Sequence, residues 1–140
     1  DMLSALNDAG VEYLVVGAYA LAAYGNPRAT GDIDLLVRPT AENAARVWQA
    51  IKQFGAPHGG ITVEDFSVED TVFQIGIAPR RIDLLTSISG VTFEKAWKSR
   101  QLIDVDGLQL AVLGREDLIL NKRASGRPKD LADACWLEEN

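Results

Sequence analysis

The sequence predicts an α/β domain, because strand-like hydrophobic runs alternate with segments of helical periodicity along the chain. Two observations carry most of this prediction. Residues 13–18 form a hydrophobic run that ends in a glycine turn and continues into an apolar helical segment. Residues 32–37 form a second hydrophobic run, which has the pattern of a buried strand although it contains two aspartates. The two runs therefore predict a strand, a turn, a helix and an acidic strand in succession.

The composition limits the possible functions only moderately. A length of 140 residues suffices for one hydrophobic core but not for a second substrate domain, so we expect a single domain over residues 1–140. The net charge of −6 argues against broad, nonspecific binding to DNA or to an anionic membrane. The single cysteine cannot form an intramolecular disulfide, and no segment has the length of a membrane span. We therefore expect a cytoplasmic protein.

The first half of the chain predicts three helices and two strands. In chain order these are a short helix near residues 3–6, a strand at 12–16, a helix at 18–24, a strand at 32–37 and a helix after Thr40. Thr40 is a suitable N-cap for this last helix, and Gly55 ends it. Its predicted apolar face consists of Ala44, Val47, Trp48, Ile51 and Phe54.

The second half predicts more strands and ends in two helices. A weak strand at 61–63 is followed by strands at 72–77 and 81–85, a short helix at 92–97, strands at 101–105 and 108–112, and helices at 115–125 and 128–138. Asp106-Gly107 is a strong signal for a two-residue hairpin turn. Gly126 separates the two final helices.

Asp32 and Asp34 are the residues that point most directly to chemistry. Side chains alternate across a strand, so both carboxylates should lie on the same side. Two like charges on one face of a strand repel each other, and aspartate is uncommon in strands. A divalent cation held between the carboxylates would offset this repulsion.

Asp83 supplies a third carboxylate, on the later strand at 81–85. If this strand pairs beside the strand of Asp32 and Asp34, three carboxylates converge, as two-metal phosphoryl transfer requires. One of them could also accept the proton of an attacking hydroxyl group. The alternative is a structural aspartate that is solvated or paired with Arg81, and the sequence leaves both interpretations open.

These motifs resemble a known enzyme family. Val16-Gly17-Ala18, followed by Asp32-Ile33-Asp34-Leu35 and then Asp83, is similar to the signature of the nucleotidyltransferase (DNA polymerase β-like) superfamily. The segments 115–122 and 127–133 resemble the tail of small bacterial members related to the toxins of abortive-infection type IV toxin–antitoxin systems. The resemblance implies a nucleotidyltransferase fold, which is a mixed β-sheet flanked by helices with further helices at the C-terminus.

The resemblance also implies roles for individual residues. Asp32, Asp34 and Asp83 would bind Mg²⁺ or Mn²⁺ and act as the catalytic carboxylates. The nucleotide-binding residues would be Gly17, Ala18 and Lys122. Arg28 lies in the loop before the acidic strand, where it could reach a phosphate or could equally be solvated. The implied reaction transfers a nucleotidyl group from a nucleoside triphosphate to a hydroxyl group of an unknown acceptor, which could be a protein, a tRNA or a small molecule.

Two alternatives to this function stay open at the level of sequence. The first is a toxin of a toxin–antitoxin pair, which performs the same chemistry on a cellular target and has a protein partner encoded nearby. The second is a pseudoenzyme or antitoxin-like module that binds a protein. Ala18 favours the second alternative, because the family has Gly or Ser at this position and a serine hydroxyl can hydrogen-bond a phosphate. Asp130 is also open, since it could be catalytic or could simply begin the last helix.

Overall fold

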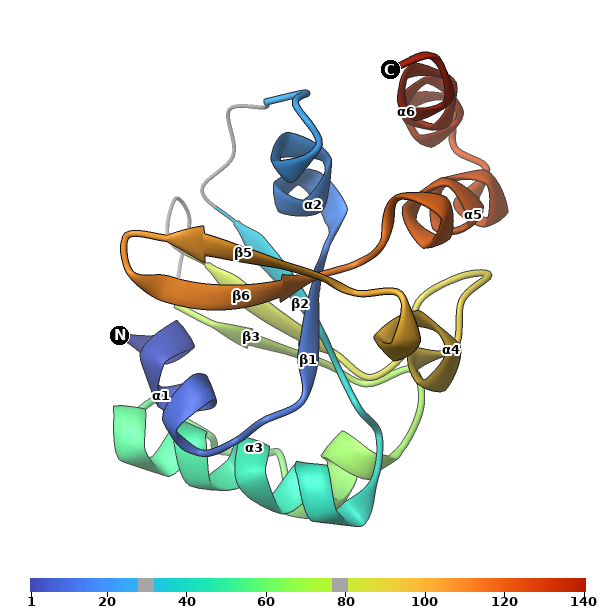
Figure 1. The fold of residues 1–140 in the computed structure, drawn as a ribbon. Coiled ribbons are helices and arrows are strands. Elements are labelled where there is room, and N and C mark those ends of the chain that lie inside the picture. The colour runs from blue at the N-terminus through green and yellow to red at the C-terminus, as the bar shows by residue number, and fades with distance from the viewer. Residues whose placement is uncertain (28–31, 77–80) are drawn as a thin grey trace.

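The computed structural model describes residues 1–27, 32–76 and 81–140 (Figure 1). In chain order its elements are α1 (Met2–Asp8), β1 (Tyr13–Val16), α2 (Gly17–Ala23), β2 (Ile33–Val37), α3 (Ala41–Phe54), the 3₁₀-helix η1 (Val63–Ser67), β3 (Val72–Ile75), β4 (Ile82–Leu85), α4 (Phe93–Lys98), β5 (Gln101–Val105), β6 (Leu108–Val112), α5 (Arg115–Ser125) and α6 (Pro128–Glu139).

The strands of the described residues form one mixed sheet in the order β3-β4-β2-β1-β6-β5. Strand β1 is antiparallel to β2 and parallel to β6. Strand β2 is parallel to β4, and the two edge strands, β3 and β5, are antiparallel to their neighbours. This arrangement confirms the predicted α/β class with a mixed sheet flanked by helices.

Helices cover the sheet from two sides (Figure 1). Helices α1 and α3 pack against each other at the bottom of the view, whereas α2 lies at the top, where it contacts β1 and β2. Helices α5 and α6 pack side by side at the upper right. The central strands β1, β2 and β4 are largely buried and almost continuously apolar, as expected for strands that are covered on both faces, whereas most residues of the edge strands β3 and β5 are exposed or partly exposed.

The core centres on β1, β2 and β4. All four residues of β1 are buried, and Leu35, Leu36 and Leu84 are at most 1% exposed. In β2 only Asp34 is partly exposed. None of the helices in the described ranges has both the length and the hydropathy needed to cross a membrane.

Most predicted local signals are present in the structure. The Thr40 side chain accepts a hydrogen bond from the Asn43 backbone N–H at the start of α3. Gly55, which ends this helix, is left-handed with φ 84°. Asp106 and Gly107 both have positive φ, at 54° and 82°, as the predicted two-residue turn between β5 and β6 requires.

Three predictions about local structure are wrong. The segment that begins at Val63 is a 3₁₀-helix rather than part of a strand, and the Asp65 carboxylate stabilises its start by accepting a hydrogen bond from the Thr62 N–H at 2.8 Å. Phe54 is 46% exposed although the helical pattern assigns it to the core, and it is the last residue of α3. Strand β2 begins at Ile33, so Asp32 precedes the strand instead of belonging to it.

Candidate functional site

Two of the three predicted carboxylates lie side by side on adjacent strands. In the parallel pairing of β2 and β4, Asp34 stands opposite Asp83. On its other side, Asp34 stands opposite Val16, the last residue of β1. Adjacent strands are about 4.8 Å apart, so the two carboxyl groups share one small region near the N-terminal ends of β2 and β4. Asp32 lies immediately before β2, next to this region.

The Asp34 carboxyl group has an unusual electrostatic environment. Burial, repulsion from the Asp83 carboxylate, a hydrogen bond to Asp83 and repulsion from Asp32 together raise the pKa of Asp34 from 3.8 to about 6, although Arg81 acts in the opposite direction. A protonated Asp34 donates the hydrogen bond to the Asp83 carboxylate. The fold therefore concentrates negative charge here more than it neutralises it.

Arg81 supplies part of the missing positive charge. Its Nη2 atom lies 3.2 Å from Asp32 Oδ2, and its Nε atom lies 3.0 Å from Asp83 Oδ1. Nη2 also donates a hydrogen bond to Asp83 Oδ2 at 3.3 Å. The ion pair that the sequence left as the structural alternative for Asp83 is thus present, and so is the convergence of Asp83 with Asp34.

The donor set of this cluster fits a divalent cation. Carboxylate oxygens are the ligands that Mg²⁺ and Mn²⁺ prefer. Asp83 Oδ1 is buried and has Arg81 Nε at 3.0 Å, and the repulsion around Asp34 is of the kind that a bound cation removes. Within the described ranges, no three acidic, His or Cys side chains stand ready to surround an ion, and the Arg81 guanidinium lies against two of the three carboxylates. Binding of an ion would require these side chains to rearrange.

Position 17 requires a glycine because the backbone there lies against the carboxylate cluster. Its φ of 69° lies in the left-handed region, which glycine adopts far more readily than other residues. A Cβ atom at this position would lie only 2.6 Å from Asp34 Oδ2. The glycine therefore allows the end of β1 to turn into α2 directly against the carboxylate.

A cleft of about 260 Å³ extends from this turn to the C-terminal helices. Gly17, Ala18 and Asp34 line it, and α5 and the start of α6 contribute Asp130 and three cationic side chains: Lys122, Arg127 and Lys129. The cleft thus joins the carboxylate cluster to a set of positive charges that are distant in sequence.

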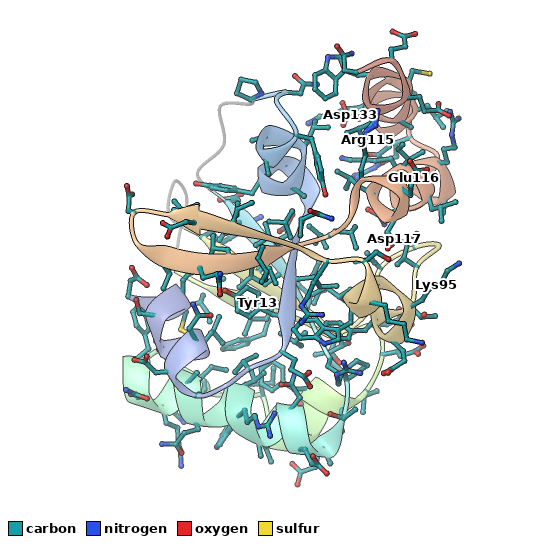
Figure 2. The ribbon with its side chains drawn as sticks, in the orientation of Figure 1. Tyr13, Lys95, Arg115, Glu116, Asp117 and Asp133 are labelled. Atoms are coloured by element: carbon teal, nitrogen blue, oxygen red, sulfur yellow. The ribbon has the colours of Figure 1, made fainter. Side chains whose placement is uncertain are left out.

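The tail residues form a buried ion-pair network between α5 and α6. The Lys122 Nζ atom lies 3.2 Å from Asp133 Oδ2 and 3.6 Å from Asp130 Oδ1. All three side chains are at least 90% buried, so Lys122 does not expose its amine as a lysine beside an apolar stripe often does. Figure 2 shows Asp133 on α6, the helix that packs beside α5. The network therefore holds Lys122 at the wall of the cleft.

Arg127 extends this network toward solvent. Its Nε atom donates a hydrogen bond to Asp130 Oδ2 at 2.7 Å. Burial alone would raise the pKa of Asp130, but the hydrogen bond from Arg127 and the charges of Lys122 and Arg127 lower it below its usual value. Asp130 is consequently an ionised residue that positions two cations. This network supports the structural interpretation of Asp130 more than a catalytic one.

Arg127 and Lys129 belong to the site although the sequence pattern alone does not assign them to it. Their signal was present, because both belong to the tail segment 127–133 that resembles the toxin group. Their position across the cleft from Gly17, however, follows only from the packing of α6. Arg28 lies outside the described residues.

A comparison with protein families is decisive for the assignment. The model of a family described as nucleotidyltransferases of unknown function (DUF6036) matches residues 2–136. The chain belongs to this family. No curated protein matches the sequence significantly.

Solved structures with the same fold are distant in sequence. A nucleotidyltransferase-like protein of Thermotoga maritima, TM1012, superposes with a TM-score of 0.66 at 17% identity, covering 99% of this chain and 89% of its own. The antibiotic-resistance factor ANT(2'')-Ia gives 0.61 at 16% identity, with coverages of 96% and 79%. The lincosamide antibiotic adenylyltransferase LnuA, solved with lincomycin, gives 0.59 at 13% identity, with coverages of 97% and 91%. These similarities establish the nucleotidyltransferase fold.

Proposed function

We propose that the protein is a metal-dependent nucleotidyltransferase that moves a nucleotidyl group from a nucleoside triphosphate to an acceptor hydroxyl group. The observation that carries this proposal is one cleft, lined by Gly17, by Asp34 beside Asp83, and by the cationic side chains Lys122, Arg127 and Lys129. Carboxylates that bind a cation and cations that bind phosphates are the two requirements of a metal–triphosphate site.

In this proposal Asp32, Asp34 and Asp83 hold Mg²⁺ or Mn²⁺, and the ion supplies charge neutralisation for the triphosphate. The Asp83 carboxylate accepts the proton of the acceptor hydroxyl group. The acceptor oxygen forms a bond with the α-phosphorus while the bond from the α-phosphorus to the bridging oxygen breaks, and pyrophosphate leaves. The family and the fold support the reaction class, whereas the residue roles are our inference.

The cationic wall suits an anion with several charges. Arg127 is 78% exposed and lines the cleft, and its hydrogen bond to Asp130 uses only Nε, which leaves its terminal N–H groups for a phosphate. Lys129 adds a second solvent-accessible charge. Lys122 is already paired with Asp130 and Asp133, so it contributes as a fixed charge at the wall. We infer that Arg127 and Lys129 bind the outer phosphates.

For the acceptor, we infer a small molecule with a hydroxyl group as the first class to test. LnuA, which shares the fold over 97% of this chain, is a lincosamide antibiotic adenylyltransferase. A toxin that modifies a tRNA or a protein, with a protein partner encoded nearby, is the same chemistry with another acceptor.

A pseudoenzyme that binds a protein is the alternative of a different class. Ala18 supports it, because the nucleotide-facing turn lacks the hydroxyl group of a serine. The ion pairs of Arg81 with two of the three carboxylates also support it.

Thermal unfolding with and without nucleotide tests the proposed function. ATP or GTP with Mg²⁺ should raise the Tm of the wild-type protein, because a ligand that binds only the folded state stabilises it, by about 2.7 kcal/mol at one hundred times its Kd. Asp32→Asn should lose the metal-dependent part of this increase. Asp8→Asn, which changes an exposed aspartate at the end of α1, is the control for the charge change and should keep the full increase. An equal increase in wild type and Asp32→Asn would contradict the proposed site.

A further inference from the structure

We propose that Arg81 is an internal counter-ion of the carboxylate cluster, and that a divalent cation must displace it from Asp32 or Asp83 in order to bind. Arg81 would then set the metal affinity of the site, keeping it lower than three carboxylates alone would give. This inference rests on the proposed function, because it takes these carboxylates as metal ligands.

The contacts of Arg81 are those of a bridging cation. Through Nη2 and Nε its guanidinium group reaches one oxygen of Asp32 and both oxygens of Asp83, at 3.0–3.3 Å. A planar guanidinium group matches the geometry of a carboxylate in this way, and an ammonium group does not. In the folded protein Arg81 therefore compensates the charge of two members of the cluster.

A divalent ion competes for the same oxygen atoms. Mg²⁺ binds carboxylate oxygens at about 2.0–2.1 Å. An ion on the Asp83 oxygen that faces Arg81 Nε would thus lie within roughly 5 Å of that nitrogen. At this distance the guanidinium charge of Arg81 and the double charge of the ion repel each other. Even in water this repulsion weakens binding of the ion on the order of tenfold. Arg81 and the metal ion therefore cannot both keep their closest contacts with the Asp83 carboxylate.

The surroundings of Arg81 allow the exchange. The side chain is 34% exposed, and that of Asp32 is 32% exposed, so the pair between them can open toward solvent. Asp34 lines the cleft beside Gly17, where an entering ion meets it directly. The Asp83 side chain is only 10% exposed and stands opposite Asp34 on the neighbouring strand. An ion that begins on Asp34 therefore reaches Asp83 by replacing Arg81.

Direct measurement of Mn²⁺ binding tests the inference without any assay of activity. Free Mn²⁺ is quantified by electron paramagnetic resonance in titrations of wild type, Arg81→Gln, Arg81→Lys and Arg46→Gln. Arg46 is an exposed residue of α3, so Arg46→Gln changes the net charge equally but leaves the cluster intact. We expect Arg81→Gln to bind Mn²⁺ roughly tenfold more tightly than wild type, and Arg46→Gln to bind as wild type does. Arg81→Lys, which keeps the charge but loses the fork, should bind more tightly than wild type by a smaller factor.

Thermal unfolding of the same proteins supplies the second readout. In EDTA, Arg81→Gln should have a lower Tm than wild type, because the carboxylates then repel each other without compensation, and saturating Mn²⁺ should narrow this difference. Unchanged or weaker Mn²⁺ binding in Arg81→Gln would overturn the inference, and Arg81→Lys provides the same test if Arg81→Gln does not fold. If wild type and Arg81→Gln both fail to bind Mn²⁺ while remaining folded, the proposed metal site itself fails. Binding in wild type that Arg81→Gln does not strengthen refutes the role of Arg81 alone.

Discussion

Replacing Asp34 with Asn should stabilise the metal-free protein at alkaline pH. Asn has nearly the same shape as Asp, and its amide can donate a hydrogen bond to Asp83 as a protonated carboxyl group does. The substitution removes the charge that burial and the neighbouring carboxylates disfavour. The expected gain is therefore the free energy that the wild type loses when it ionises Asp34 in the folded state.

The magnitude follows from the raised pKa of Asp34. A rise from 3.8 to about 6 corresponds to about 3 kcal/mol. Because the side chain is partly exposed, solvent screening reduces this to about 1–2 kcal/mol. The folded pKa lies above the unfolded one, so the stabilisation from the protonated form is complete below pH 3.8 and is lost as the pH rises through about 6. The advantage of Asp34→Asn should thus be largest at pH 8, and about half as large at pH 5.

The assay is thermal or urea unfolding of both proteins in EDTA at pH 5 and pH 8. For a domain of this size we expect Asp34→Asn to unfold about 5 °C above wild type at pH 8. Asp8→Asn changes an aspartate at the end of α1, which is not part of the cluster, and serves as control. Its stability difference from wild type should not grow between pH 5 and pH 8 in this way. A lower stability of Asp34→Asn at pH 8, or the same difference at both pH values, would refute the reasoning about this cluster.

Three further predictions concern the cleft. Gly17→Ala should abolish the Tm increase with Mg²⁺ and ATP and lower the free energy of unfolding by about 1–3 kcal/mol, because its Cβ would lie 2.6 Å from Asp34 Oδ2. The control is Gly107→Ala, which has a similar positive φ but no atom within 4 Å of the added Cβ; it should introduce only backbone strain and keep nucleotide binding. Lys122→Met should destabilise the protein by about 3 kcal/mol in urea unfolding, since it removes the cation that lies 3.2 Å from the buried Asp133 carboxylate. Adding Asp133→Asn should recover part of the loss, and additive effects would contradict the pairing. Ala18→Ser should strengthen binding of labelled ATP or GTP by at most about 1.5–3 kcal/mol if the pocket is functional, and binding in neither protein, with the fold intact, would favour the pseudoenzyme.

Local chemistry explains why much of the fold could be predicted. The cap at Thr40, the turn at Asp106-Gly107 and the hydrophobic runs that became β1 and β2 each depend on a few neighbouring residues, and the structure contains all of them. The wrong predictions lie where a local sequence pattern does not show where a helix or strand ends or which of two elements forms. At Phe54 the helical periodicity continued to the last residue of α3, which is 46% exposed. Near Val63 a side-chain cap favoured a 3₁₀-helix over a strand.

Acidic residues within apolar runs, preceded by a glycine turn, are visible in the amino-acid sequence, and they predict a site for a metal and a nucleotide. Which of these charges contact one another depends on the packing of the elements. The parallel register of β2 and β4 places Asp34 opposite Asp83, and Arg81, the residue just before β4, lies beside Asp32 and Asp83. The packing of α6 on α5 buries Lys122 between Asp130 and Asp133 and carries Arg127 to the cleft. Such pairings depend on contacts between segments that are far apart in the chain, and no local preference of a residue specifies them.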